Sequence, residues 1–256
     1  MNEMLTQAIW WAGMCLEAVM LFRGLRERLL FKYPVFYLYI AFVFLEDLLR
    51  FYIYGWHPAI YPQTYWITEF FGLVIGSGVV FEIYRSGLSA YPGTARMARN
   101  LLFLVFALTF AKVLVSMSYG SLWWPTKTTA ELQRNLRIVQ ATALIALVAL
   151  FLMYAIPFGR NLKGILSGYS FYIAVNIVQL TLVPHFGNSI QRLWSYVYSA
   201  SYLIALCIWT RALWSHELSP ETKPGTPLEY DYEALRAATR RRLQETRASL
   251  GRAVRP

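Results

Sequence analysis

The sequence predicts an all-α membrane protein: a bundle of seven transmembrane helices with its N-terminus outside and its C-terminus in the cytoplasm. Composition, the length of the apolar runs and the distribution of positive charge carry this prediction. Of the 256 residues, 57% are hydrophobic and only 15% are charged, whereas a soluble domain carries about 25% charged residues. The apolar residues gather into runs of about 20, the length that crosses about 30 Å of hydrocarbon.

The first run has no basic segment before it and no cleavage pattern after it, so we interpret it as a span and not as a removable signal. Proline, glycine and polar residues separate it and its successors, which is typical of loops. A β-barrel is excluded because its strands alternate strictly over about 10 residues. The spans are expected at residues 5–22, 34–54, 63–84, 100–118, 132–155, 164–183 and 193–214.

Lysine and arginine give the orientation. On one side of the predicted membrane, the loops hold only Lys127 and Arg192, and we assign this side to the outside. The positive-inside rule therefore places the C-terminus in the cytoplasm. The residues on the predicted inner side are Arg23, Arg26, Arg28, Lys32, Arg85, Arg96, Arg99, Arg160 and Lys163.

The composition changes after the last span. Residues 215–228 contain three prolines and are predicted to form an irregular linker. Residues 229–256 combine helical spacing, a narrow apolar stripe and many arginines, which is typical of a helix that lies on anionic lipid headgroups. A disordered tail and a cytoplasmic protein partner are the alternatives.

Charged and amide side chains within the spans are the candidate ligand-binding residues, because a charge in hydrocarbon is costly. They concentrate in the outer half and could line a pocket for a small anionic or zwitterionic molecule. The alternative is a purely structural network of ion pairs. In it Glu46 or Asp47 pairs with Arg50 at helical spacing, and Glu69 pairs with Lys112 or an arginine. Tyr65, Trp66, Tyr196 and Tyr202 are candidate walls. The candidate ligand-binding residues are Asp47, Arg50, Glu69, Lys112, Arg134, Arg137, Gln140, Asn176 and Gln179.

A second cluster, Glu82 and Arg85, ends the third span, and we expect an ion pair that fixes the cytoplasmic turn. The segments Tyr65-Trp-Ile-Thr-Glu-Phe70, Glu82-Ile-Tyr-Arg85 and Tyr91-Pro-Gly93 are similar to segments of uncharacterised bacterial seven-span membrane proteins. That resemblance implies the same topology and a location in the inner (plasma) membrane, but no activity.

Several known seven-span chemistries are not expected. The topology resembles that of microbial rhodopsins, yet the last span has no lysine for a retinal Schiff base. His57, His185 and His216 fall on opposite sides, so they cannot assemble the zinc site of seven-span amidohydrolases. We therefore predict no metal, no cofactor and no enzymatic activity. The net charge of +10 is assigned to cytoplasmic loops and not to nucleic-acid binding.

Two functions remain. The first is a receptor-like sensor or ligand-binding protein that responds to a small molecule in the outer pocket. The second is a transporter of a small solute, which would need polar residues through the inner half as well. Because residues 141–152 are almost wholly apolar, the sequence favours the sensor. Assembly into a homo-oligomer is left open.

Overall fold

The computed structural model describes residues 2–89, 91–119, 125–153, 159–186, 188–214 and parts of 230–245; no side chain is described at 2–6, 92, 110, 112–132 or 182–195. This part of the chain is helical and contains no strand. A short α2 (Leu29–Lys32) and a 3-10 turn η1 (Pro58–Ile60) accompany the long helices. The long helices are α1 (Asn2–Arg26), α3 (Pro34–Trp56), α4 (Tyr61–Gly87), α5 (Pro92–Tyr119), α6 (Pro125–Met153), α7 (Arg160–Phe186) and α8 (Asn188–Ala212).

Each predicted apolar run falls almost wholly within one long helix, but the helices are longer than the runs. α5 begins at Pro92 rather than at residue 100, and α6 begins at Pro125 rather than at residue 132. Prolines predicted to lie in loops instead begin helices. A proline fits the first helical turn because the N–H that it lacks would have no partner there.

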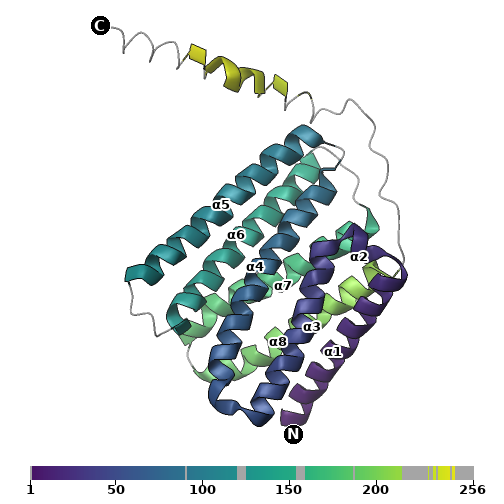
Figure 1. The fold of residues 1–256 in the computed structure, drawn as a ribbon, viewed down its shortest axis with the longest axis vertical. Helices are drawn as coiled ribbons and strands as arrows, with labels where there is room; N and C mark the ends of the chain where they lie inside the picture. Colours follow the sequence, from purple (N-terminus) through teal and green to yellow (C-terminus); the bar gives the residue numbers. More distant parts are fainter. Residues whose placement is uncertain are drawn as a thin grey trace.

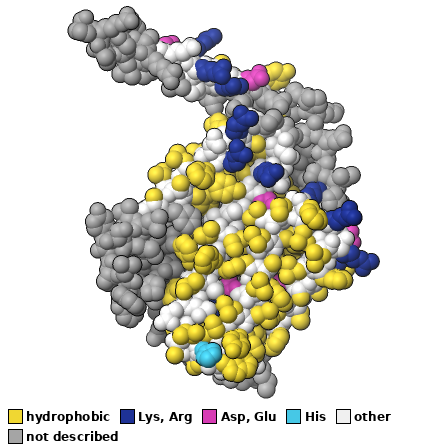
Figure 2. All heavy atoms as spheres, in the orientation of Figure 1, with side chains coloured by type: hydrophobic (Ala, Val, Ile, Leu, Met, Phe, Trp, Pro, Cys, Tyr) yellow, Lys and Arg dark blue, Asp and Glu magenta, His cyan; other side chains and the backbone are white. Residues whose placement is uncertain are grey.

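Among the described residues, three helical segments are long and apolar enough to cross a membrane: Gln7–Arg26, Pro58–Gly87 and Gln133–Met153. Large apolar side chains such as Leu101, Phe103 and Leu108 also face outward, and hydrophobic atoms cover most of the face in Figure 2. Both features are compatible with a protein embedded in a membrane.

Six of the long helices pack in a closed ring. Each contacts the next in the order α1, α3, α4, α6, α7, α8, and α8 returns to α1. α5 packs outside this ring, against α4 and α6, at the opposite edge of the bundle from α1 (Figure 1). The inside of the ring is therefore enclosed by helices that are far apart in sequence.

Large aromatic side chains fill one end of the ring, where α3 begins and α8 ends. Trp209, Tyr169 and Phe36 are completely buried, and the rings of Phe36 and Trp209 lie 5.2 Å apart. The Trp209 indole donates to the Ile165 carbonyl at 3.2 Å. Gly168 permits this packing, because a Cβ there would overlap the indole. We call Trp209, Tyr169 and Phe36 the aromatic plug.

Glu82 stabilises the start of α3. Its two carboxylate oxygens accept hydrogen bonds from the backbone N–H groups of Val35, at 2.9 Å, and Phe36, at 2.7 Å. The predicted ion pair with Arg85 is therefore replaced, since Arg85 is exposed and forms no ion pair with Glu82. The first N–H groups of a helix have no partner within it, so a carboxylate is favoured there.

Candidate functional site

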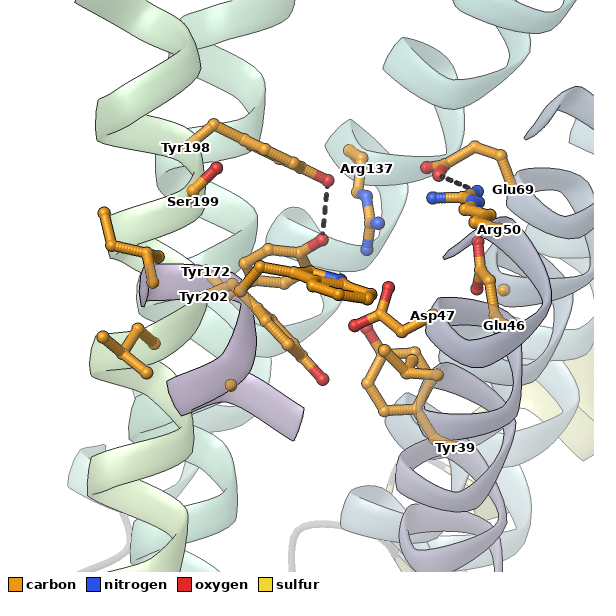
Figure 3. A pocket seen from close by; sticks show the side chains of 16 residues that line it. Tyr39, Glu46, Asp47, Arg50, Glu69, Arg137, Tyr172, Tyr198, Ser199 and Tyr202 are labelled. Carbon is orange, nitrogen blue, oxygen red and sulfur yellow. Dashed lines mark hydrogen bonds and ion pairs between the residues drawn. The ribbon is translucent and has the colours of Figure 1, made fainter. Parts of the chain in front are cut away.

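A cavity of about 260 Å³ lies between the six ring helices, and each of them contributes to its wall. Carboxylates, guanidinium groups and tyrosines line it (Figure 3). The aromatic plug separates this cavity from the end of the bundle at which α3 begins. Its ionisable and tyrosine side chains are Glu46, Asp47, Arg50, Glu69, Arg137, Tyr39, Tyr172, Tyr198 and Tyr202.

Arg50 contacts several residues of α3 and α4. It pairs with Glu46, one helical turn earlier on α3, and with Glu69 Oε2 at 3.5 Å. Its Nε and Nη2 donate to Thr68 Oγ1 at 3.1 and 2.9 Å. The guanidinium also lies 4.3 Å from the centre of the Tyr65 ring. The two carboxylates more than balance the positive charge of Arg50, so this group carries no excess positive charge for an anionic ligand.

Glu69 extends this group to α6. Its Oε1 accepts a hydrogen bond from the Gln133 side chain at 2.8 Å, while Oε2 faces Arg50. Both oxygens are thus engaged, and the side chain is only 11% exposed. The Glu46–Arg50–Glu69 group, the saturated triad, joins α3, α4 and α6 around one side of the cavity.

Arg137 has very different surroundings. Its side chain is 3% exposed, yet it forms no ion pair among the described residues. Nη1 donates to Gln140 Oε1 at 3.3 Å, and the buried Nε has no hydrogen-bond partner. The guanidinium lies 5.2 Å from the centre of the Tyr172 ring. A buried cation therefore borders the cavity without a compensating carboxylate.

A polar chain holds Arg137 from behind. Gln140, which is fully buried, accepts from Arg137 and donates to Ser77 Oγ on α4 at 3.1 Å. Ser77 in turn donates to the Leu73 carbonyl at 2.9 Å. Arg137 and Gln140 share a helix face because they are three residues apart. This chain orients the guanidinium without neutralising it.

Asp47 is the carboxylate of the cavity that is not part of the triad. It is half-buried and forms no ion pair in the described part of the chain. Its carboxylate interacts with the indole of Trp10 on α1. Figure 3 shows Asp47 and Arg137 both pointing into the cavity, from α3 and α6.

Tyrosine hydroxyl groups complete the polar wall. The hydroxyl groups of Tyr172 and Tyr198 are hydrogen-bonded at 2.9 Å (Figure 3). The Tyr202 hydroxyl donates to Glu17 Oε1 at 2.7 Å. Glu17 is fully buried, and its other oxygen, Oε2, has no hydrogen-bond partner. The wall thus holds groups that donate and accept hydrogen bonds at several points.

The structure brings together four of the nine predicted ligand-binding residues: Asp47, Arg50, Glu69 and Arg137. Gln140 stands behind Arg137 and does not line the cavity. Of the predicted walls, Tyr202 lines the cavity, Tyr65 lies against Arg50, and Trp66 and Tyr196 contribute nothing to it.

The other four predicted residues do not join them in the structure. Arg134 is exposed and does not line the cavity, although its spacing of three residues places it near Arg137 on α6. Asn176 is buried and donates to the Tyr172 carbonyl on its own helix at 3.2 Å. Gln179 does not line the cavity, and the side chain of Lys112 lies outside the described residues.

Sequence reasoning missed Tyr39, Tyr172 and Tyr198 as lining residues, and it predicted Glu46 only as an ion-pair partner of Arg50. A signal for some of them is present. On α3 the cavity is lined by residues 39, 43, 46, 47 and 50, which is the spacing of one helical face. Tyr198 and Tyr202 are likewise one turn apart. Extending the face of Arg50 backwards by helical periodicity would have found Glu46 and Tyr39.

Comparisons of the chain with protein-family models, with curated proteins and with solved structures find no match. The chemistry of the cavity is therefore argued from its own residues.

Proposed function

We propose that this chain is a seven-span membrane protein that binds a small ligand in the cavity of its helical ring, as a receptor-like sensor or binding protein. One observation carries the proposal: Arg137, buried and without a carboxylate partner, borders a cavity that also holds Asp47. Leaving a buried charge uncompensated costs several kcal/mol. A binding site explains why such a group is retained.

The charge distribution supports an outer N-terminus. In Figure 2 the Lys and Arg side chains gather toward one end of the molecule. Arg23 and Arg26 end α1 at the charged end, so the N-terminus lies at the end poor in charge (Figure 1). The positive-inside rule then assigns the charged end to the cytoplasm, and the cavity lies in the half of the bundle nearer the N-terminus.

The aromatic plug favours a sensor over a transporter. Trp209, Tyr169 and Phe36 are fully buried on the cytoplasmic side of the cavity in this orientation. Transport would require these interlocked rings to separate, whereas sensing requires only a change in how α1, α3 and α8 pack around the ligand. A sensor therefore needs less rearrangement of the observed core.

The test is a thermal-stability screen of the purified full-length protein in nanodiscs against a library of metabolites. A variant that fills the cavity, Gly72→Leu, provides the control, because Gly72 lines the cavity and a Cβ there meets neighbours only at 3.6 Å or more. Gly55→Leu is its match, since nothing lies within 4 Å of a Cβ at that position. We expect hits that stabilise the wild type and Gly55→Leu but not Gly72→Leu.

Uptake of each hit into proteoliposomes separates the two functions. No uptake supports the sensor, and robust uptake that Gly72→Leu abolishes would establish the transporter instead. A screen in which no compound distinguishes Gly72→Leu from Gly55→Leu would refute ligand binding in the cavity.

A further inference from the structure

We infer that the ligand is a small zwitterion, whose oxyanion is bound by Arg137 and whose ammonium group is bound by Asp47. This inference rests on the proposed function and adds the chemical class of the ligand to it. It follows from the ion pairs among the five charged residues of the cavity, from the two residues that have no ion pair, Asp47 and Arg137, and from the volume of the cavity.

Arg137 is built to receive an oxyanion. Its Nε is buried and has no hydrogen-bond partner, and the guanidinium is otherwise bonded to neutral groups, the side chains of Gln140 and Tyr169. A guanidinium presents its N–H groups in a planar fork that matches a carboxylate or phosphate in a bidentate manner. The hydroxyl groups of Tyr172 and Tyr198 lie on the same side of the cavity and can donate further hydrogen bonds to the bound oxygens.

Asp47 supplies the opposite charge. It lines the cavity from α3, forms no ion pair in the described part of the chain, and has Trp10 and Tyr39 beside it in the wall. The hydrogen bond from the Trp10 side chain is neutral and leaves the charge of Asp47 without a cation partner, so an ammonium group is favoured beside it. The two ends of the ligand therefore meet two different helices, α3 and α6.

The charge balance favours a zwitterion over a simple ion. Glu46 and Glu69 already flank Arg50, so the saturated triad offers no free cation and would repel an anion. A ligand with only a negative charge would leave Asp47 without a counter-charge. A ligand with only a positive charge would leave Arg137 without one. Only a molecule that carries both charges satisfies both side chains.

The size of the cavity limits the ligand further. Pockets for drug-sized molecules measure about 300–1,000 Å³, and this cavity is slightly below that range, at about 260 Å³. A free amino acid or a molecule of similar size fits this space. The headgroup of a phosphatidylethanolamine lipid has the same pair of charges, so the experiment must separate the free molecule from the lipid.

The first experiment measures binding of a series of ω-amino acids, from glycine to 6-aminohexanoate, to the full-length protein in phosphatidylglycerol nanodiscs. The series reads out the charge separation that the cavity accepts. For the best binder, the carboxamide and the N-acetyl derivative each remove one charge. We expect calorimetry to show binding of each derivative weakened roughly 10- to 100-fold, as for the loss of a hydrogen-bonded charge.

Nanodiscs made with phosphatidylethanolamine distinguish the two sources. If the headgroup occupies the cavity, the response to the free amino acids is lost there but present in phosphatidylglycerol; if a free molecule is the ligand, both nanodiscs respond. Either result supports a zwitterion site and names its source.

Two variants assign the charges. With Arg137→Gln, the zwitterion and its carboxamide should bind with equal affinity, because the partner of the oxyanion is gone; Arg137→Lys should restore part of the difference. With Asp47→Asn, the zwitterion and its N-acetyl derivative should become equal. Arg134→Gln and Glu233→Gln, at exposed positions outside the cavity, should keep the wild-type ratios.

The inference is overturned if either singly charged derivative binds the wild type as tightly as the zwitterion, or if the variants leave the ratios unchanged. A library hit with only one charge, still blocked by Gly72→Leu, would also overturn it while leaving ligand binding in the cavity intact. Failure of the Gly72→Leu comparison for every compound would remove the binding function itself.

Discussion

The two arginines of the cavity show how surroundings decide what a buried charge contributes. Arg50 has two carboxylates and a threonine hydroxyl around it, so its charge joins helices. Arg137 is more deeply buried but has a glutamine as its hydrogen-bond partner. The same residue type thus acts as a structural cation at one position and as a candidate ligand-binding cation at the other.

This contrast predicts opposite effects of the same substitution. Arg50→Met leaves Glu46 and Glu69 buried without a cation, and we expect it to lower the stability by about 3–5 kcal/mol. Arg137→Met removes a charge that has no carboxylate partner, so the stability should stay equal or rise while ligand binding is lost. Denaturant titration of both variants without ligand measures this. Equal destabilisation by the two would show that Arg137 belongs to the structural network.

Glu17 and Tyr202 give a second prediction at this scale. Tyr202→Phe removes the hydrogen-bond donor of Glu17, whose other oxygen already lacks a partner, and should cost about 1–3 kcal/mol. Glu17→Gln keeps an oxygen that accepts from Tyr202 but cannot ionise, so the double variant Glu17→Gln/Tyr202→Phe should lose less stability than Tyr202→Phe alone. A thermal double-mutant cycle measures the coupling, and strictly additive effects would contradict it.

Among the elements, α3 depends on a side chain from another helix. Tyr33 precedes α3 and provides no side-chain cap, and Glu82 of α4 takes that role across 46 and 47 residues of sequence. The contact also fixes how α3 leans on α4, the helix pair that positions the saturated triad. A cap at one end of the pair therefore supports the cavity at the other.

Removing this cap should destabilise the protein. Glu82→Ala leaves the N–H groups of Val35 and Phe36 buried without an acceptor, and we expect a loss of about 1–3 kcal/mol. Arg85→Gln is the matched control, because Arg85 is exposed and should change the stability by less than about 0.5 kcal/mol. A similar loss of stability in both variants would support the ion pair that the sequence predicts between Glu82 and Arg85.

At the scale of the whole molecule, the sequence predicts the long helices well and the partners of their side chains poorly. Runs of apolar residues locate each helix because burial in lipid or core requires them. Whether Glu82 meets Arg85 or the N-terminus of α3 depends on packing between distant segments, which periodicity does not encode. For the same reason, the sequence predicts Asp47 and Arg137 in one region. It does not predict that Glu46 and Glu69 pair with Arg50 and leave Asp47 and Arg137 without ion-pair partners.

The proposed seven-span topology requires α3 to cross the membrane although it carries three charged residues. α3 carries Glu46, Asp47 and Arg50 and is not among the three helical segments apolar enough to span by composition. All three charges face the cavity, while Leu38, Leu45 and Leu49 of the same helix are exposed on its outer face. A helix with its polar residues turned inward can lie in lipid at little cost, so the charges of α3 are compatible with the proposed seven spans.

Labelling of single cysteines distinguishes seven spans from three. In a variant without Cys15 and Cys207, H57C lies between α3 and α4, and S89C lies between α4 and α5. If α3 crosses the membrane, the N-terminus and residue 57 are on the same side, because α1 and α3 both lie between them. If only α1, α4 and α6 cross, these two positions are on opposite sides, whichever way the chain is inserted.

We expect an impermeant maleimide to label H57C in intact cells and S89C only after permeabilisation, with an N-terminal epitope accessible from outside. This result requires α3 to span despite its three charges, and it places the inward-facing cluster of Figure 3 within the bilayer. The cysteine-free protein is the control for background labelling. An outer epitope together with protection of H57C would mean that α3 does not cross the membrane. Glu46, Asp47 and Arg50 would then lie outside the hydrocarbon, and their inward orientation would not be a consequence of contact with lipid.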